Sequence, residues 1–555
     1  MVWVILPLCL FTFLPLGAQP GWTSKAAKSV FTLKTFAADG SLIASSNGFF
    51  VNEQGDAVST FTPFINAQRA VIIDASGKEA AVECMLGANE MLDVAKFRVA
   101  SKKAEPLTIA TAQAANGSEV WLLPYSTKKP NAVKGTVQKS ETLMEKYSYY
   151  TLNLTMAESA VGSPLLNANG QVIGMMQPSA QPVTTTSYAI SAAYASSLTI
   201  SAFSLNDATL KKTHIKLALP DDKEQAQLTL FMAASTMSME EYAALTDDFI
   251  SKFPDSPDGY ITRAQLHVNN DKFDAADADM QQAVSVSNAK DDTYYNYARI
   301  IYQKEVYKHD KPFEPWSLDR ALEEIHRSID LNPQPAYRHL EGQILFAQQK
   351  YTEADQLFQQ LLQTDMRSAE LFYESARCKE MLADTTAQLA LLDSAVNANS
   401  RPFLREAAPY IWARATALLN AGKNRQAVLD FNEYEKLMGN NVNADFYYIR
   451  EQAELGGRQF QQALDDIRKA TEMAPGEYLY WAERASLEVR VSMPDDAIRS
   501  AQTCISIAPD ESDGYLFLGV AQCQKNNKAE GLKNLNIAKE KGNSQADALI
   551  ERYSK

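Results

Sequence analysis

The second half of this 555-residue chain repeats itself with a period of about 34 residues. About eight copies fill residues 257–545, and in each an aromatic residue, small residues and often a proline recur at similar offsets. The clearest copy runs from Tyr447 to Pro475, and the next one follows with Trp481, Ala485, Ala497, Ala501 and Pro509. Apolar residues in each copy follow the helical period, which predicts two helices per copy. Because one helix pair cannot bury its apolar face alone, the copies are expected to stack as a solenoid.

These offsets resemble tetratricopeptide repeats, in which two antiparallel helices form each unit. The resemblance implies an all-α, right-handed solenoid over residues 257–545. Residues 225–256 look like one degenerate helical repeat, and residues 546–555 are expected to form a capping helix. One copy contains an insertion from Tyr307 to Trp316, rich in proline and aromatic residues, which is expected to form a long loop that contacts a partner or the N-terminal domain.

In proteins with such repeats, the first helix of each pair lines a concave groove. The resemblance places these partner-binding candidates there: Tyr295, Arg299, Tyr302, His339, Gln343, Phe346, Tyr373, Arg377, Trp412, Tyr448 and Gln452. Aromatic rings offer contact area at low entropic cost, and arginine adds bidentate or stacking contacts, so the set suits an extended or helical peptide segment. The alternative is that several of these rings pack between repeats. The Lys and Asn pattern of repeats that clamp chaperone tails is absent, which argues against a cytosolic co-chaperone.

The N-terminal half of the chain follows a different period. From Lys28 to about Ile200, short runs of alternating apolar residues are separated by turns that contain Gly and Asn, as at Asn52 to Gly55. Such spacing predicts an all-β barrel or sandwich. The pattern loosens over residues 201–224, which are expected to form a linker into the helical half.

One stretch of the β region, Ser159 to Gly174, resembles the nucleophile segment of trypsin-like, HtrA-type serine peptidases. The residues that match are Gly162, Ser163, Pro164 and Leu165, followed by a turn and Val172, Ile173 and Gly174. The resemblance implies an all-β double barrel over residues 28–200. It places the catalytic positions of the family at Thr62 for the base, Asp93 for the orienting acid and Val161 for the nucleophile.

The residues at these positions do not support the chemistry of the family. Val161 has no hydroxyl to activate, so the acyl-enzyme route cannot start there. Asp93 has no imidazole to orient, because the first histidine of the chain is His214, beyond the β domain. Ser159 stands where the family has the glycine that lets backbone amides converge on the oxyanion. The sequence therefore predicts a pseudo-peptidase with no catalytic residues.

A peptidase with unrecognised chemistry is the alternative. Ser159 and Ser163 are the hydroxyls nearest to the nucleophile position. A Ser-Lys dyad would need a desolvated lysine of lowered pKa, for which Lys96 is the nearest candidate. The preferred interpretation is that Ser163 packs beside the nucleophile position, Ser159 replaces a turn glycine and Lys96 is solvated.

Composition excludes several functions. A net charge of −14 and a pI of about 5.1 argue against nucleic acid as a partner. The sequence has no phosphate-binding glycine loop and no zinc-finger spacing, so no cofactor or metal is expected. The cysteines beyond the N-terminal segment, Cys84, Cys378, Cys504 and Cys523, are too sparse for a disulfide framework. They are expected to be buried thiols, with pairing of Cys504 and Cys523 as the alternative.

Residues 1–18 form an apolar run that ends in small residues, which is typical of a secretory signal peptide with a mature start near Gln19. No later stretch is apolar for long enough to span a bilayer. The Ala-Gln junction resembles exported proteins of Bacteroidota. These features predict export to the periplasm, or association with the outer membrane.

Three hypotheses for function follow. The leading one is a non-catalytic scaffold of the cell envelope, in which the pseudo-peptidase domain and the groove of the repeats bind protein or peptide partners. The second is a periplasmic chaperone or assembly factor that holds clients in the groove. The third is a serine peptidase with unrecognised chemistry. The sequence names neither the partner nor the oligomeric state.

Overall fold

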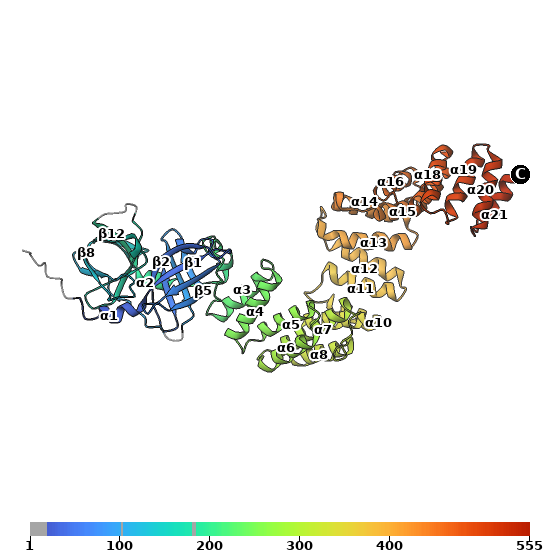
Figure 1. Cartoon of the computed structure of the whole chain (residues 1–555). Helices are drawn as coiled ribbons and strands as arrows, with labels where there is room; N and C mark the ends of the chain where they lie inside the picture. Colours follow the sequence, from blue (N-terminus) through green and yellow to red (C-terminus); the bar gives the residue numbers. More distant parts are fainter. Residues whose placement is uncertain (1–18, 102–103, 180–184) are drawn as a thin grey trace, which may run out of the picture. The chain divides into compact units, whose positions relative to one another are not determined.

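The structure is a computed structural model that describes residues 19–101, 104–179 and 185–555 (Figure 1). Its described residues divide into two compact units, one that ends at Leu266 and one that spans His267–Lys555. The expected signal peptide, residues 1–18, lies outside the described residues.

The first β-barrel begins after a short helix α1 (Thr23–Ala26) and closes in the strand order β1-β2-β3-β6-β5-β4. Its strands are β1 (Val30–Phe36), β2 (Leu42–Phe50), β3 (Asp56–Ser59), β4 (Arg69–Ile73), β5 (Glu79–Asn89) and β6 (Val94–Val99). All its pairings are antiparallel. Alternating apolar residues of these strands, among them Phe31, Leu33 and Phe97, fill the interior. This is the pattern from which a barrel was expected.

The second barrel closes in the order β10-β11-β12-β9-β8-β7. Its strands are β7 (Glu119–Leu122), β8 (Val133–Leu143), β9 (Tyr147–Asn153), β10 (Pro164–Leu166), β11 (Val172–Gln177) and β12 (Thr186–Ser191), and α2 (Ala192–Ser197) follows the last strand. Val120, Leu152 and Leu165 are buried in its interior. A separate buried cluster joins the two barrels through Phe49 of β2 and Leu166 of β10. The double-barrel prediction is confirmed.

The segment 201–224, expected as a linker, is folded onto the first barrel. It contains the 3-10 helices η4 (Ala202–Asn206) and η5 (Leu210–Lys212). Leu210 and Ile215 are buried in the core of the first barrel, and Leu217 bridges to Met85 of β5. The apolar side chains that carry these contacts are spaced among lysines and threonines, so no strand or helix period marked them in the sequence.

The helical half begins with α3 (Lys223–Ala233) and α4 (Met239–Lys252), which occupy the stretch expected as a degenerate repeat. The helices from residue 257 to residue 540 fall into eight successive pairs: α5 (Pro257–Asn269) and α6 (Phe273–Val286), α7 (Lys290–Tyr307) and α8 (Leu318–Leu331), α9 (Pro335–Ala347) and α10 (Tyr351–Leu361), α11 (Ala369–Met381) and α12 (Thr385–Asn397), α13 (Ala408–Asn420) and α14 (Asn424–Met438), α15 (Ala444–Gly456) and α16 (Phe460–Met473), α17 (Tyr478–Arg490) and α18 (Pro494–Ile507), α19 (Asp513–Gln524) and α20 (Lys528–Glu540). The final helix is α21 (Ala546–Ser554).

The period of the sequence also appears in the backbone between the helices of each pair. A residue with positive φ follows the first helix of every pair except α7, before the insertion; it is Gly422 after α13 and a non-glycine residue after the others, at Asp271, Gln349, Ala383, Arg458, Ser492 and Asn526. Such residues close helices because their amides bond back to the last turn. Within the second unit, first helices of neighbouring pairs also touch, as α7 touches α9 and α17 touches α19. The all-α repeat array is therefore confirmed, and the name repeat array is used below for α5–α20.

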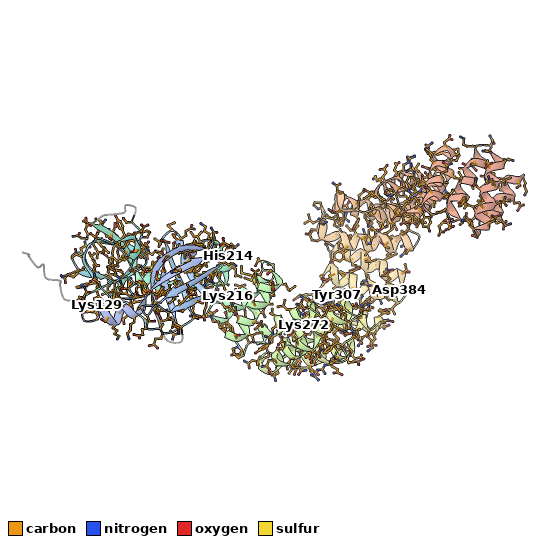
Figure 2. The ribbon with its side chains drawn as sticks, in the orientation of Figure 1. Lys129, His214, Lys216, Lys272, Tyr307 and Asp384 are labelled. Atoms are coloured by element: carbon orange, nitrogen blue, oxygen red, sulfur yellow. The ribbon has the colours of Figure 1, made fainter. Side chains whose placement is uncertain are left out.

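The insertion from Tyr307 to Trp316, between α7 and α8, is anchored on α6 of the preceding repeat. Trp316 is buried, its ring packs against Phe273 of α6, and its indole N–H donates to Asp277 Oδ1 at 2.7 Å. Tyr307 is exposed (Figure 2). Trp316 therefore does not meet the expectation of a loop directed at a partner, because its indole N–H donates to a partly buried carboxylate beside it.

The four cysteines of the described residues all carry free thiols. Cys504 of α18 donates its S–H to the Tyr478 carbonyl at 3.5 Å, whereas Cys523 of α19 packs beside Gly531 of α20. Burial raises the pKa of Cys504 to about 11 and that of Cys378 to about 12. Cys378, Cys504 and Cys523 are buried as expected, whereas Cys84 is partly exposed. Cys504 and Cys523 do not pair, because their side chains are directed at different neighbours.

Candidate functional site

The base and acid positions of the β region lie in direct contact. Thr62 begins the 3-10 helix η2 (Thr62–Phe64), which follows β3. Asp93 Oδ1 accepts hydrogen bonds from the Phe61 amide at 2.9 Å, from the Thr62 amide at 2.7 Å and from Thr62 Oγ1 at 2.8 Å. One oxygen of the carboxylate thus caps this helix.

The nucleophile position, Val161, follows the 3-10 helix η3 (Glu158–Ala160). Its amide donates to the Glu158 carbonyl at 3.2 Å, and its carbonyl accepts from the Asn47 amide of β2 at 3.0 Å. In a serine peptidase the amide of the nucleophile belongs to the oxyanion hole. Here that N–H is directed into the turn of η3, so it is not available to a tetrahedral intermediate.

The serine and lysine candidates have separate surroundings. Ser163 is fully buried, and its hydroxyl has no hydrogen-bond partner among the described residues. Ser159 is exposed, and its carbonyl accepts from Asn47 Nδ2 at 2.5 Å. Lys96 is partly buried, and its Nζ donates to the Leu198 carbonyl at 3.2 Å. Lys96 is therefore only partly solvated, because the chain after α2 contacts it, and its hydrogen bond goes to a carbonyl and not to a serine.

His214 is attached to the first barrel, although the sequence placed it beyond the β domain. Its amide donates to the Ala67 carbonyl at 3.0 Å, just after η2, and its side chain is exposed (Figure 2). Among the described residues the His214 ring makes no hydrogen bond, to Asp93 or to any other group. It therefore does not rebuild the acid–base pair of a peptidase.

In the repeat array, candidates from three successive first helices meet around one hollow. Tyr302 of α7, Gln343 and Phe346 of α9, and Arg377 of α11 line a cavity of about 100 Å³, together with Glu374 of α11 and Phe358 of α10. Arg377 lies over the Phe346 ring, with 5.0 Å between its guanidinium carbon and the ring centroid. The name groove hollow is used below for these six residues.

The floor and rim of the groove hollow are held by internal contacts. Phe358 is buried at the base, where Gly342 makes room for it, because a Cβ at Gly342 would lie 2.5 Å from the Phe358 ring. Glu374 accepts from Gln343 Nε2 at 2.7 Å, and its other oxygen bonds His339 Nε2 at 2.5 Å. Burial lowers the pKa of the His339 ring, but the hydrogen bond and charge of Glu374 outweigh burial and raise that pKa above its ordinary value.

The remaining candidates make contacts outside this hollow. Four of them pack against other rings: Tyr295 against Tyr337, Tyr373 against Tyr410, Tyr448 against Tyr480, and Trp412 against Phe431, Tyr434 and Phe446. Arg299 bonds Asn296 at 2.8 Å, and Gln452 bonds Glu451 at 2.5 Å. Trp412 thus belongs to inter-repeat packing, the alternative that the sequence left open.

Comparison with known proteins addresses both halves. Residues 39–175 match the family model of the trypsin-like peptidase domain. The two barrels form a trypsin-like peptidase domain.

Solved structures similar to this domain include the Rv3671c protease from M. tuberculosis in its active form and the HtrA-type protease AlgW with a tripeptide. The former is 16% identical, with a TM-score of 0.28, and the match covers 35% of this chain and 92% of that chain. The latter is 16% identical, with a TM-score of 0.27, and the match covers 31% of this chain and 59% of that chain. A curated relative, the TPR repeat-containing thioredoxin TDX of Arabidopsis thaliana, is 29% identical over 80 residues. That match covers 14% of this chain and about a fifth, 21%, of the relative.

Two residues of the groove hollow, Glu374 and Phe358, were not among the partner-binding candidates predicted from the sequence. Glu374 follows Tyr373 on α11, and Phe358 lies on a second helix, which the register assigns to packing. The signal for Glu374 was its position one turn before Arg377. In the described residues, no group of three or more His, Cys, Asp or Glu is placed to hold a metal ion, and no helix is long and apolar enough to cross a membrane.

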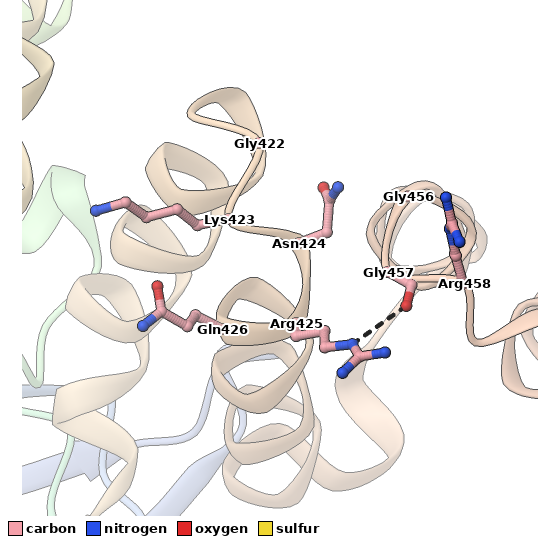
Figure 3. Close-up of a pocket in the computed structure, with 8 residues that line it drawn as sticks. All are labelled: Gly422, Lys423, Asn424, Arg425, Gln426, Gly456, Gly457 and Arg458. Carbon is pink, nitrogen blue, oxygen red and sulfur yellow. Dashed lines mark hydrogen bonds between the residues drawn. The ribbon is translucent and has the colours of Figure 1, made fainter.

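A second hollow in the repeat array, of about 530 Å³, is lined by backbone and by basic side chains (Figure 3). Its lining residues are Gly422, Lys423, Asn424, Arg425, Gln426, Gly456, Gly457 and Arg458. Arg425 Nε donates to the Gly457 carbonyl at 3.3 Å. Its three cations, Lys423, Arg425 and Arg458, have no carboxylate or hydroxyl side chain beside them among the lining residues.

Proposed function

We propose that this chain is an interaction protein without peptidase activity, which holds a segment of a partner protein in the groove of its repeat array. The observation that carries the proposal is the groove hollow, where side chains of three successive repeats surround an opening between helices. Arg377 is exposed there and makes no hydrogen bond or ion pair with any described residue. Aromatic residues and arginine around a central hollow are the typical anchors of protein interfaces.

The trypsin-like domain supports a non-catalytic role. Val161 lacks a nucleophilic group, its amide is bonded to Glu158, and Asp93 caps η2 in the absence of an imidazole. We infer that this domain serves the protein as a rigid binding module. The location in the cell envelope, periplasmic or outer-membrane-associated, is part of the proposal and rests on the apolar run of residues 1–18.

Affinity purification from the envelope fraction of the native cells tests the proposal. The wild-type chain is compared with a Tyr302→Ala and Arg377→Ala double variant, and mass spectrometry of the N-terminus reads whether the mature chain starts near Gln19. We expect the double variant to lose its partner, with a total loss of about 2 kcal/mol or more in binding free energy. Its melting temperature should change little, because both side chains line an opening and not the packed face.

An Arg367→Ala variant is the matched control. Arg367 is also exposed and also lies 5.0 Å from an aromatic centroid, that of Phe372, but it does not line the groove hollow. It should retain the partner. One defined partner supports a scaffold, whereas many unrelated clients support the chaperone alternative. Retention of the same proteins by the double variant, with its fold intact, would contradict the proposed function.

A further inference from the structure

At the rim of the groove hollow, the negative charge of Glu374 has hydrogen-bond partners, whereas the positive charge of Arg377 has none among the described residues. Both carboxylate oxygens of Glu374 are engaged, one by Gln343 and the other by His339. The guanidinium of Arg377, one turn later on α11, has no anionic partner within the described residues, although it lies on the Phe346 ring. A guanidinium stacked on a ring is held in place while its N–H groups remain directed outward. The rim therefore presents one oriented cation.

The interior of the groove hollow limits what lies next to that cation. Phe346, Phe358 and Tyr302 supply apolar surface, and the Tyr302 hydroxyl makes no hydrogen bond among the described residues. Burial raises the pKa of Tyr302, so the phenol stays neutral. The hollow, of about 100 Å³, is smaller than the cavity of roughly 150 Å³ that accepts benzene. This space suits a branched aliphatic side chain of three or four carbon atoms and is too small to enclose an indole.

We infer that the groove hollow recognises an internal segment of a partner protein in which a Leu- or Val-sized side chain lies one or two residues from an aspartate or glutamate. The aliphatic group enters between Tyr302, Phe346 and Phe358, and the carboxylate accepts two N–H bonds from Arg377. This inference rests on the proposed function and adds the chemistry of the partner to it. Charge complementarity selects the occupant, because a basic segment would face Arg377 unpaired.

An internal segment fits this position better than a chain end. The hollow lies between helices of three repeats, and ring contacts flank it: Tyr295 of α7 packs against the buried Tyr337 of α9, and Tyr373 of α11 packs against Tyr410 of the next first helix, α13. A segment that runs along the array therefore finds a partly exposed aromatic ring on each side of the hollow, Tyr295 and Tyr373.

Fluorescence anisotropy with synthetic peptides on the full chain tests the inference. Each probe is a labelled, C-terminally amidated peptide with a central Leu, so that only a side chain can supply the carboxylate. Companion peptides carry Asn or Gln, or Lys, in place of the acid, and Gly or Trp in place of Leu. We expect the acidic Leu peptide to bind about tenfold more tightly than its Asn or Gln companion, and the Gly and Trp companions to bind at least as weakly.

Reversing the charge of Arg377 tests the inference more directly. Arg377→Glu should exchange the preference, so that the Lys peptide binds more tightly than the acidic one, whereas Arg367→Glu should leave the preference unchanged. Circular dichroism of both variants confirms that the repeats are folded. Equal binding of acidic and neutral peptides, or no change with Arg377→Glu, would overturn the inference while the proposed function stands. The inference also fails, and the proposed function stands, if no amidated peptide binds but the Tyr302→Ala and Arg377→Ala variant still loses its partner. Retention of that partner overturns the proposed function itself.

Discussion

Replacing Gly162 by Ala is expected to destabilise the trypsin-like domain by about 3 kcal/mol or more. Gly162 has a φ of +81°, and a Cβ built on it would lie 2.1 Å from the Asn47 carbonyl oxygen. That oxygen cannot move aside, because Asn47 lies within β2 and the carbonyl also accepts from Ser59 Oγ at 2.6 Å. The methyl group would therefore push η3 away from β2, where the two barrels meet.

Gly40→Ala is the control for this prediction. Gly40 has the same φ of +81°, but nothing lies within 4 Å of its Cβ position. The Gly40→Ala variant should lose only about 1 kcal/mol of unfolding free energy, from the strain of the left-handed conformation. Hydrogen–deuterium exchange of peptides from residues 28–200 measures the domain separately from the helices. Equal loss of protection in the two variants would show that the contact with Asn47 contributes nothing.

Replacing Glu451 by Gln should stabilise the repeat array increasingly as the pH rises. Glu451 of α15 is fully buried, and one of its oxygens has no hydrogen-bond partner among the described residues. Burial, and after it the charge of Glu483, raises the pKa of Glu451 to about 8. Glu454, one turn later, is also buried, and burial followed by the charge of Asp466 raises its pKa to about 8.

The sign of the pH dependence follows from these raised pKa values. The folded chain keeps a proton on Glu451 that the unfolded chain releases near its ordinary pKa, so this stabilisation is complete below about pH 4 and is lost as the pH rises through about 8. At about pH 9 the glutamine variant should be more stable by roughly 4 kcal/mol, and at about pH 4 by almost nothing.

Urea unfolding followed by far-UV circular dichroism at both pH values measures the difference. Glu472→Gln is the control for loss of one negative charge, because Glu472 on α16 is exposed. A gain that is the same at acid and alkaline pH would contradict the explanation by burial.

The repeat register predicted which residues lie on first helices, because small and large residues recur at fixed offsets, but it did not predict the groove hollow. Tyr302, Phe346 and Arg377 were placed on first helices from that register, and the structure brings them together. The register assigns a residue to a face but does not say whether a neighbouring ring covers it, so Trp412 was not distinguished from packing residues. The sequence predicted that Cys504 is a buried thiol, which the structure confirms. It did not predict where the thiol points, because that direction is set by the hydrogen bond to the Tyr478 carbonyl.

The β domain was predicted from the alternation of apolar residues and from the motif around Gly162. Both signals depend on residues that are close together in the sequence. Contacts between distant segments were not predicted. No periodic pattern in residues 201–224 predicts that Leu210 and Ile215 pack into the core of the first barrel. The hydrogen bond from the His214 amide to the Ala67 carbonyl depends on that packing. Likewise, the capping of η2 by Asp93 depends on a backbone conformation that the sequence pattern does not encode.

Labelling of the full chain with a fluorophosphonate probe tests most directly the claim that the trypsin-like domain acts by binding and not by catalysis. Such probes phosphonylate an activated serine, and the domain offers Val161 at that position, with Ser163 buried and Ser159 exposed beside it. We predict no labelled peptide within residues 28–200, and the same result for Ser159→Ala. Labelling at Ser159 that disappears in the Ser159→Ala variant would contradict the claim and would show that the domain contains an activated serine.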